Sequence, residues 1–351
     1  MKGAGEAGGA PEASGKTEPA GQHGITARVP AKLNLQLAVG PPRADGYHDL
    51  VTVFHAVSLF DRVTVEPAGR DAVTVTGEGA GRVPADGDNL ALRAVAALRA
   101  AVRDSGTGTP GVRVTIAKKI PVAAGLAGGS ADAAAALVAC NELWAAGLTQ
   151  QQLCEVGATV GSDVAFALLG GTAVGRGRGE QLTPALVPAT QYHWVLAFAD
   201  GQLSTPEVYA TMDRLRTARS ADPGSPSGPA GAEGPAVPAA AAAAGAAGPG
   251  LDAALMSALR AGDARRVASR LSNDLQPAAV SLFPALRKTL AAGLDLGALG
   301  ALVAGSGPTC VFLAASSERA LDLAVAMSGA GVCRSVARVT GPVPGAAVVS
   351  A

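Results

Sequence analysis

The sequence predicts an α+β fold of two domains packed side by side. The chain has 351 residues, enough for about two domains at roughly 150 residues each. Hydrophobic residues make up 48% of it, so each domain can bury a core. Strand-like runs come first in the sequence and strands alternate with helices later, which is typical of α+β domains.

Two segments are predicted to lie outside these domains. Residues 1–24 have no apolar stretch of the kind that a signal peptide needs, and we expect a disordered tail. Residues 217–250 are rich in Pro, Gly, Ser and Ala, which cannot bury enough surface to offset the entropy of ordering. We expect a flexible insertion there, within which the run Ala239–Ala244 allows a short helix. The domains are then 25–185 and 186–345, the second interrupted by the insertion.

In the first half, β-branched and alternating runs predict strands, and apolar residues that recur on one helical face predict helices. The expected strands are Ile25–Pro30, Val51–Leu59, Val63–Glu66, Val73–Thr76, Val112–Ile116 and Thr172–Val174, of which the third and fourth resemble a meander. The expected helices are Asn89–Val102, Ser130–Ala145, Gln150–Val160 and Asp163–Leu169, with Asp88 as the N-cap of the first.

In the second half, strands and helices alternate around the insertion. The expected strands are Trp194–Ala199, 310–314 and 333–339. The expected helices are Pro206–Leu215, 251–260, 262–271, 279–292 and 317–328.

Composition and charge exclude several classes of protein. The 28 Lys and Arg balance the 28 Asp and Glu, which argues against a basic surface that grips nucleic acid. No stretch approaches the roughly 20 apolar residues of a membrane-spanning helix. The four cysteines lie far apart without CxxC spacing, so they predict buried free thiols of a reducing compartment. We therefore expect a cytoplasmic protein without a dedicated metal-ligand cluster.

A strand that runs into a glycine-rich turn and directly into a helix predicts a phosphate-binding site. The stretch is Lys118-Lys119-Ile-Pro-Val-Ala-Ala-Gly125-Leu126-Ala127-Gly128-Gly129-Ser130-Ala131-Asp132. Small residues let the backbone approach a ligand, and N–H groups at a helix start point at bound anions. Ser130 is expected near the N-cap, where its hydroxyl can bond a phosphate oxygen or a metal-bound water. The stretch is neither a Walker A loop nor a dinucleotide fingerprint, and a purely structural turn is the alternative.

Four further segments accompany this turn. They are Pro30-Ala31-Lys32-Leu33-Asn34-Leu35, Arg43-Ala44-Asp45-Gly46-Tyr47-His48-Asp49-Leu50, Gly161-Ser162-Asp163-Val164 and Ala304-Gly305-Ser306-Gly307-Pro308-Thr309. Together with Pro121–Asp132 they resemble the signature motifs of the GHMP small-molecule kinases, named for galacto-, homoserine, mevalonate and phosphomevalonate kinases. The first two segments resemble more narrowly the branch of that family that phosphorylates a cytidylyl methylerythritol. The resemblance spans residues from Ile25 to Val339, interrupted by the insertion.

The resemblance implies a two-domain GHMP kinase fold, with an N-terminal ATP-binding domain like ribosomal protein S5 and a ferredoxin-like C-terminal α/β domain. It implies ATP-dependent phosphorylation of the 2-hydroxyl of cytidylyl methylerythritol, in non-mevalonate isoprenoid biosynthesis, giving ADP and the 2-phosphate. Mg²⁺ is expected with ATP, because a bare triphosphate carries too much charge to react easily. The implied partners are these small molecules, with no nucleic acid and no membrane, and the chain is expected to be a monomer or a homodimer.

By the same resemblance, Lys32 and Asp163 flank the acceptor hydroxyl as the catalytic residues. Asp163 is implied to accept or orient the proton, and Lys32 to stabilise charge on the acceptor oxygen and the transferring phosphate. The alternatives are a helix N-cap or first-turn acid for Asp163 and the solvated end of a strand for Lys32.

The resemblance also assigns the substrate-binding residues, which are Asn34, Tyr47, His48, Thr205, Pro206 and Tyr209. Tyr47 is implied to stack on cytosine, His48 to bond its polar edge, and Tyr209 to close the other side. A core tyrosine with a satisfied hydroxyl is the alternative for Tyr209. Asn34 is expected to hold the methylerythritol or to order Lys32, and a local turn bond is its alternative.

The nucleotide-binding residues that the resemblance implies lie mainly in the glycine turn. They are Pro121, Val122, Ala123, Ala124, Gly125, Leu126, Ala127, Gly128, Gly129, Ser130, Ala131, Asn89 and Lys118, of which the last two line the adenine pocket. Ala127 and Ala131 depart from the Gly and Ser that are usual in the family. Alanine keeps the loop small, but it removes the freedom to adopt φ > 0 and one hydroxyl.

Other functions are left open. Another GHMP kinase, of the homoserine or mevalonate type, lacks a reason for the segment Arg43–His48. A non-catalytic nucleotide-binding protein would bind ATP without transferring phosphate. A Ser–His–Asp hydrolase has weak support, because Gly305–Thr309 predicts a tight turn between a helix and a strand rather than a nucleophile elbow, and His55 and His193 are typical of satisfied core or edge residues. The cluster Gly175–Gly179 has no helix after it and predicts a turn.

Overall fold

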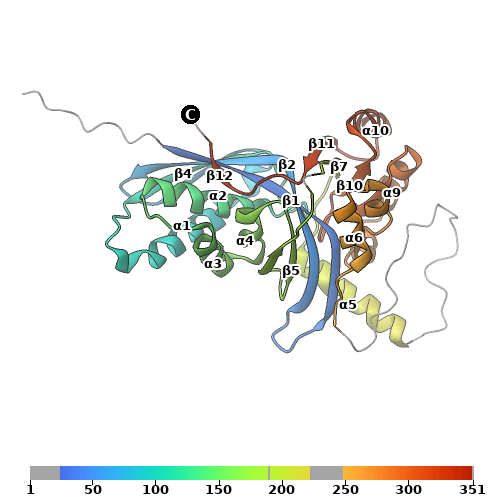
Figure 1. Cartoon of the computed structure of the whole chain (residues 1–351), viewed down its shortest axis with the longest axis horizontal. Coiled ribbons are helices and arrows are strands. Elements are labelled where there is room, and N and C mark those ends of the chain that lie inside the picture. The colour runs from blue at the N-terminus through green and yellow to red at the C-terminus, as the bar shows by residue number, and fades with distance from the viewer. Residues whose placement is uncertain (1–23, 189, 222–247, 350–351) are drawn as a thin grey trace, which may run out of the picture.

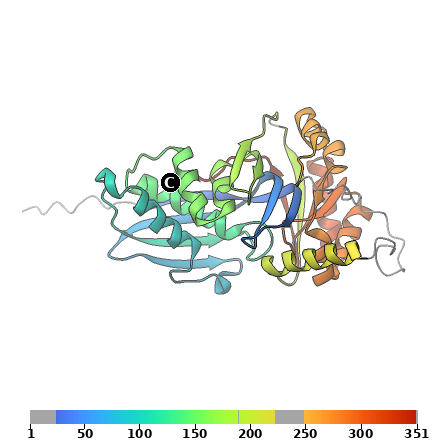
Figure 2. The ribbon, with the colours of Figure 1, turned by 90° about the horizontal axis from the view of Figure 1, so that it is seen from below.

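The computed structural model describes residues 24–188, 190–221 and 248–349, so most of the predicted tail and residues 222–247 of the predicted insertion lie outside the described residues. The molecule is elongated, with one sheet and its helices at each end (Figure 1). A view from below shows the same two bodies side by side (Figure 2). The predicted α+β class is confirmed.

The larger sheet has eight strands, ordered β12-β1-β2-β4-β3, with β5 on β2, β6 on β5 and β8 on β1. They are β1 (Ile25–Pro42), β2 (His48–Ala68), β3 (Ala72–Gly77), β4 (Gly111–Lys118), β5 (Thr172–Arg176), β6 (Gln181–Pro184), β8 (Ser272–Asn273) and β12 (Ala347–Val348). β1 and β2 form a long antiparallel hairpin whose register shifts after Pro30, Asn34 and Val39. Such bulges bend a strand and redirect its side chains.

Four helices cover one face of this sheet. They are α1 (Leu90–Ala101), α2 (Gly128–Leu143), α3 (Gln150–Val160) and α4 (Ser162–Leu169), with the short 3-10 turns η1 (Ala80–Arg82) and η2 (Arg103–Ser105) nearby. α2 packs on β1 and β2 and also contacts α1, α3 and α4. Its many alanines are buried, because small side chains let a helix sit closely between a sheet and other helices.

The smaller sheet is antiparallel, with the order β11-β7-β10-β9. Its strands are β7 (Tyr192–Phe198), β9 (Gly300–Val303), β10 (Cys310–Ala314) and β11 (Ser335–Gly341). Its helices are α5 (Thr205–Ala221), α6 (Ala253–Ala261), α7 (Ala264–Ala268), α8 (Gln276–Leu282), α9 (Ala285–Asp295) and α10 (Ser317–Gly329). Helices between β7 and β9, the pair β9–β10, and α10 before β11 give the ferredoxin-like connectivity.

Segments from late in the chain return to the first body, so one boundary in the sequence does not separate the two bodies. The expected boundary between residues 185 and 186 falls between β6 and β7. Yet β8 and β12, both from later in the chain, pair with β1. Gly170 also forms an isolated bridge with Pro344. The end of the chain therefore returns to the first sheet, which ties the two bodies together.

Several expected elements differ from the observed ones. The predicted strands Ile25–Pro30, Val51–Leu59 and Val63–Glu66 are parts of the much longer β1 and β2. The predicted meander is wrong, because β3 pairs in parallel with β4 and not with β2. A parallel pair needs a crossover connection, and α1 supplies it. The sequence predicted no strand at the positions of β6, β8, β9 and β12.

Helix boundaries differ where a local side chain decides them. The N-cap of α1 is Asn89 rather than Asp88, since the Asn89 side chain accepts the Ala91 N–H. The predicted helix 279–292 is two helices, α8 and α9, separated at Phe283 and Pro284. Proline lacks an N–H and disfavours helix in the residue before it. α5 continues to Ala221, so the first residues of the predicted insertion are helical.

The four cysteines, which were predicted to be buried free thiols, differ in their burial. All four cysteines are free thiols; Cys140 and Cys310 are buried, whereas Cys154 and Cys333 are half-buried. Burial raises the pKa of the Cys140 thiol to about 12. In the part of the chain that the structure describes, no helix is long and apolar enough to span a membrane.

Candidate active site

Lys32 and Asp163, the predicted catalytic pair, lie close together although 131 positions separate them in the sequence. Lys32 Nζ is 3.9 Å from Asp163 Oδ2. Lys32 lies in the interior of β1 and is only 9% exposed, so it is not the solvated end of a strand. Asp163 lies in the first turn of α4, and its side chain is 27% exposed. The pair joins a buried ammonium to a carboxylate that a ligand can reach.

Lys32 is held by a chain of buried hydrogen bonds. Its Nζ donates to Asn34 Oδ1 at 2.7 Å, and Asn34 Nδ2 donates to Thr52 Oγ1 at 2.8 Å. Thr52 in turn donates to the Gln36 carbonyl at 2.7 Å. Burial lowers the pKa of Lys32, and the charge of Asp163 opposes that shift. Of the two roles expected for Asn34, ordering Lys32 is the one that these contacts support.

The glycine turn has an unusual backbone for its alanines. Ala123 and Ala127 have positive φ of 53° and 58°, beside Gly125 at 77°. The left-handed region costs an L-residue roughly 1–2 kcal/mol. The expectation that alanine denies the turn φ > 0 is therefore wrong, since Ala127 adopts it as the N-cap of α2. The helix begins at Gly128, two residues before the predicted start at Ser130, so Ser130 lies in its first turn and near the N-cap, as predicted.

The glycine turn is anchored to β1 and to the turn of residues 304–309. The Lys32 N–H donates to the Leu126 carbonyl at 3.3 Å. A methyl group on Gly125 would clash with the Ala304 carbonyl, and one on Gly305 would lie 3.2 Å from Lys32 Nζ. The backbones therefore meet here because both residues are glycines. The turn of residues 304–309 joins two strands, β9 and β10, and not a helix and a strand as predicted.

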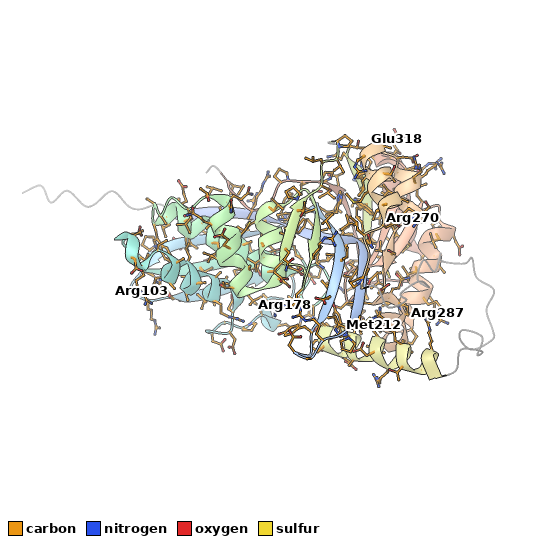
Figure 3. The ribbon with its side chains drawn as sticks, turned by 60° about the horizontal axis from the view of Figure 1, so that its bottom comes forward. Arg103, Arg178, Met212, Arg270, Arg287 and Glu318 are labelled. Atoms are coloured by element: carbon orange, nitrogen blue, oxygen red, sulfur yellow. The ribbon has the colours of Figure 1, made fainter. Side chains whose placement is uncertain are left out.

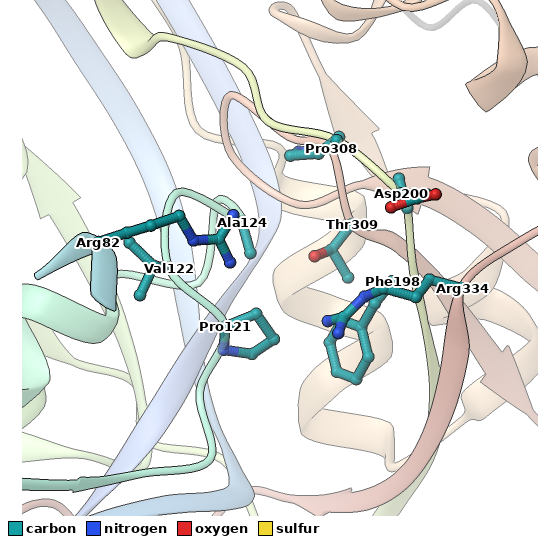
Figure 4. A pocket seen from close by; sticks show the side chains of 11 residues that line it. Arg82, Pro121, Val122, Ala124, Phe198, Asp200, Pro308, Thr309 and Arg334 are labelled. Atoms are coloured by element: carbon teal, nitrogen blue, oxygen red, sulfur yellow. The ribbon is translucent and has the colours of Figure 1, made fainter. Parts of the chain in front are cut away.

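A cavity of about 260 Å³ lies between the glycine turn and the smaller sheet. Pro121, Val122 and Ala124 line one side of it, and Pro308 and Thr309 line the other. Arg82 and Arg334 approach it from opposite sides (Figure 4). Neither Lys32 nor Asp163 is among its lining residues.

His48 and Tyr209, both predicted to bind the substrate, lie against each other. Their ring centroids are 5.1 Å apart, and His48 Nε2 lies 3.1 Å from Asp213 Oδ1. Burial, with a smaller contribution from the charge of Asp163, raises the pKa of Tyr209 to about 12. The Asp163 carboxylate therefore interacts electrostatically with the Tyr209 hydroxyl. Asp213 escaped prediction, although it lies one helical turn after Tyr209 on α5.

The remaining predicted substrate residues lie around this group. Thr205 Oγ1 is 2.9 Å from Ser306 Oγ, which links the start of α5, where Pro206 follows, to the turn of residues 304–309. Tyr47 lies at the tip of the β1–β2 hairpin and is 54% exposed. Its ring does not contact the ring of His48 or of Tyr209 in the described structure.

Asn89 and Lys118, predicted to line an adenine pocket, have other partners. Asn89 Oδ1 accepts the Ala91 N–H at 2.9 Å, and its Nδ2 donates to the Pro84 carbonyl at 2.7 Å. Lys118 Nζ is buried and donates to Asp61 Oδ2 and Asp132 Oδ2, both at 2.6 Å. Both side chains are buried and hydrogen-bonded within the protein.

The Asp61–Lys118–Asp132 triad is a buried charged cluster that the sequence did not predict. Asp61 Oδ1 accepts the Ile120 N–H at 2.8 Å, so the triad ties β2 to the start of the glycine turn. Burial, with a contribution from the Asp61 charge, raises the pKa of Asp132 to about 8. Asp132 Oδ1 is buried without a hydrogen-bond partner. Asp132 stood in the quoted glycine stretch, but Asp61 is 71 positions away and carries no local signal.

The arrangement suits phosphoryl transfer better than hydrolysis. Backbone amides at the start of α2 can hold an anion, and an ammonium and a carboxylate lie beside them. His55 is buried and burial lowers its pKa to about 3, which makes its imidazole a weak base. Its Nδ1 is 2.9 Å from Thr172 Oγ1, which holds the ring within the core.

Comparisons with protein families identify both halves of the chain. Residues 89–171 match the family described as GHMP kinases N terminal domain. Residues 255–333 match the family described as GHMP kinases C terminal.

Relatives of high identity cover nearly the whole chain. A 4-diphosphocytidyl-2-C-methyl-D-erythritol kinase of Thermobifida fusca (strain YX) is 52% identical over 93% of this chain and 98% of its own. The protein of that name from Mycolicibacterium smegmatis is 49% identical over 93% of each chain.

Solved structures agree with these relatives. A crystal structure of 4-(cytidine 5'-diphospho)-2C-methyl-D-erythritol kinase is 32% identical, with a TM-score of 0.65 over 90% of this chain and 98% of its own. Mevalonate kinase of L. major, at 15% identity and a TM-score of 0.62 over 92% and 98% of the two chains, shares the fold.

Proposed function

This chain belongs to the 4-diphosphocytidyl-2-C-methyl-D-erythritol kinases of the GHMP kinase family, and we propose how its residues carry out that reaction. It is an ATP-dependent kinase of non-mevalonate isoprenoid biosynthesis. It phosphorylates the 2-hydroxyl of 4-diphosphocytidyl-2-C-methyl-D-erythritol and gives ADP and the 2-phosphate.

Asp163 is the general base and Lys32 the charge-stabilising cation. The partly exposed Asp163 carboxylate accepts the proton of the acceptor hydroxyl as the oxygen attacks the γ-phosphorus. The buried ammonium of Lys32 offsets the negative charge on that oxygen and on the transferring phosphate. Asn34 fixes the position of the ammonium through their 2.7 Å hydrogen bond. The Lys32–Asp163 pair at the glycine turn is the observation that carries the proposal.

The glycine turn and the first turn of α2 hold the phosphates of ATP. Gly129 is exposed and Ser130 half-buried, so the backbone amides of this turn are accessible to a ligand. The positive end of the helix dipole favours the anion. Asn89 and Lys118 act on the nucleotide through the loop that they anchor rather than by contact of their side chains.

Mg²⁺ accompanies the nucleotide. Among the described residues there is no cluster of three His, Cys, Asp or Glu side chains that could hold a metal alone. Mg²⁺ in kinases is held by one or two protein oxygens together with phosphates and water, which a hydroxyl such as that of Ser130 fits. When bound, it neutralises charge on the triphosphate.

The cytidylyl end of the substrate lies at the tip of the β1–β2 hairpin against α5. His48, Tyr209 and Tyr47 supply an imidazole and two aromatic rings there. Aromatic faces stack on a base and an imidazole bonds its polar edge. Thr205 and Pro206 begin the helix that brings Tyr209 to this group. Homoserine and mevalonate contain no nucleobase that could stack on these rings.

The test is an assay of ADP release with three acceptors. We expect turnover with 4-diphosphocytidyl-2-C-methyl-D-erythritol and none with mevalonate or homoserine. Asp163→Ala should lower turnover at least ~100-fold, the scale of general-base catalysis, with ATP binding retained. Turnover of mevalonate without turnover of the cytidylyl substrate, or an undiminished Asp163→Ala variant, would refute these assignments.

A further inference from the structure

The two-residue strand β8 connects β1 with the turn of residues 304–309. Its backbone pairs in parallel with β1, where Asn273 lies opposite Leu37. The side chain of Asn273 is buried, and its Nδ2 donates to the Val303 and Gly305 carbonyls, both at 2.7 Å. Both N–H bonds of this amide are therefore used to hold one turn.

The amide of Asn273 is itself held in place. Its Oδ1 accepts the Leu275 N–H at 2.9 Å. The next residue, Asp274, makes two hydrogen bonds of 2.9 Å with backbone groups of β1, one through its own N–H and one through Oδ2. Arg216 of α5, the helix on which Met212 is labelled in Figure 3, donates to the same Oδ2 at 3.1 Å. β8 is thus fixed between β1 and α5.

Gly305 is the residue of the turn that lies against Lys32. A methyl group on it would lie 3.0 Å from the Gly125 carbonyl oxygen, 3.2 Å from Lys32 Nζ and 3.5 Å from Asn34 Oδ1. Its φ of 49° lies in the left-handed region, which glycine adopts without steric cost. The α-carbon of Gly305 therefore packs where the ammonium, its hydrogen-bond acceptor and the glycine turn come together.

Asn273 thereby sets two boundaries of the space around Lys32. Its backbone pairs with the strand that carries Lys32, and its side chain holds the residue that packs on the ammonium. Buried carbonyls are costly to leave without a donor, so the turn should rearrange when the amide is removed. Phosphoryl transfer depends on positioning, so such a rearrangement next to the ammonium affects the reaction.

We propose that Asn273 is a positioning residue for phosphoryl transfer, which holds Gly305 against Lys32 and so fixes the ammonium beside the acceptor hydroxyl. This inference rests on the proposed function, in which Lys32 stabilises the charge of the transferring phosphate. Asn273 touches neither substrate in this account, and it acts through the backbone of Gly305. The motif at residues 304–309 thus supplies the backbone that packs on Lys32, and Asn273, from outside every motif, sets its place.

Steady-state kinetics with a matched control tests this. Asn273→Ala removes both donors and should lower kcat at least ~10-fold, because small misplacements near the reacting groups cost this much or more. KM for the cytidylyl substrate should stay unchanged. Thr289→Val is the control, since the buried Thr289 Oγ1 also donates to two carbonyls, of Ala285 at 3.3 Å and of Val332 at 2.6 Å. It should lower the thermal unfolding midpoint as Asn273→Ala does and leave kcat unchanged.

Single-turnover transfer in a Lys32→Met background separates positioning from a loss of structure. Asn273→Ala added to Lys32→Met should slow transfer no further, because residues that act through one group are not additive. Its effect on the thermal unfolding midpoint should be the same in both backgrounds. Asn273→Ser, which leaves room for water at the two carbonyls, is a second and milder variant that should show the same pattern.

The outcomes separate this inference from the proposed function. Wild-type kcat in both Asn273 variants, an equal loss of kcat in Thr289→Val, or a loss that persists in the Lys32→Met background would overturn the role of Asn273 alone. A Lys32→Met variant that transfers phosphate as fast as the wild type would overturn the proposed role of Lys32, and the role of Asn273 with it.

Discussion

Lys32 is a lysine ammonium almost entirely removed from water. Such a group loses its hydration and keeps its charge only if fixed partners replace it. Asn34 and Asp163 are those partners, one by a 2.7 Å hydrogen bond and the other by charge at 3.9 Å. Burial lowers the pKa of Lys32 nonetheless. In the proposed mechanism the reaction needs this charge, which is lost at a lower pH than for an exposed lysine.

Asn34→Leu should move the alkaline limb of kcat/KM to lower pH. The amide oxygen accepts a hydrogen bond from the charged form of Lys32, so its removal favours the neutral form and lowers the pKa of Lys32 further. A pH profile of kcat/KM for the cytidylyl substrate measures this limb. Asn34→Asp, which places a negative charge on the same ammonium, should move the limb the other way. Equal profiles for the two variants would show that Asn34 does not control Lys32.

At the scale of elements, the Asp61–Lys118–Asp132 triad connects the interior of β2 and the end of β4 to the first turns of α2. Lys118 ends β4, Asp132 lies in α2, and Asp61 binds the Lys119 and Ile120 N–H groups. Two carboxylates share one ammonium in a buried place. The glycine turn links β4 to α2, and the ion pairs of the triad hold these two elements together.

The triad makes stability depend on pH in a defined direction. The pKa of Asp132 is raised in the folded chain from 3.8 to about 8, by burial first. Between these values the folded chain holds a proton that the unfolded chain has released, so the free energy of unfolding falls as pH rises through this window. Asp132→Asn removes the titrating group and should flatten this dependence. Urea unfolding of the wild type and of Asp132→Asn at pH 5 and pH 8 measures the free energy of unfolding. The same change between the two pH values in both proteins would contradict the assignment.

A helix or strand was predicted correctly where the sequence carries a local signal for it. The helix Gln150–Val160 was predicted with its observed ends, and in the structure Thr149 and Gln152 form a capping box at its start. Short strands such as β8 and β12 have only two residues each and exist through pairing with β1. No local sequence pattern encodes such pairing. Nor does any local pattern show which carboxylates bind Lys118, or that β3 lies next to β4 at the edge of the sheet.

At the scale of the whole molecule, the active site depends on a contact between two glycine turns. Gly125 from the first body and Ala304 to Gly307 from the second meet at backbone distance. Phosphoryl transfer depends on positioning. In the proposed mechanism the glycine turn holds the ATP phosphates, so a shift of this contact would misplace them relative to Lys32.

Gly125→Ala should therefore lower kcat/KM about 100-fold, since a methyl group there meets the Ala304 carbonyl. Gly147→Ala is the matched control. Gly147 has a similar φ of 68°, but nothing lies within 4 Å of the added methyl group. Both variants bear the backbone strain of about 1 kcal/mol, and only Gly125→Ala should lose activity. Equal activity losses would show that strain, not the contact between turns, is responsible.

The motifs predicted the centre of the site better than its surroundings. Lys32, Asp163, Asn34 and the pair His48–Tyr209 come together as the resemblance implies. Asp213 contacts His48 from a helix whose position depends on the tertiary fold. Its side chain carries no pattern in the sequence that distinguishes it from other surface charges.

The most direct measurement is a double-mutant cycle on Lys32 and Asp163, followed by single-turnover phosphate transfer. If the two side chains act together on one hydroxyl, Lys32→Met and Asp163→Ala should each slow transfer about 100-fold. The double variant should then be no slower than the slower single variant, because residues that act as a unit are not additive. Rates that multiply to about a 10,000-fold loss would show two independent contributions and contradict the shared role of the pair.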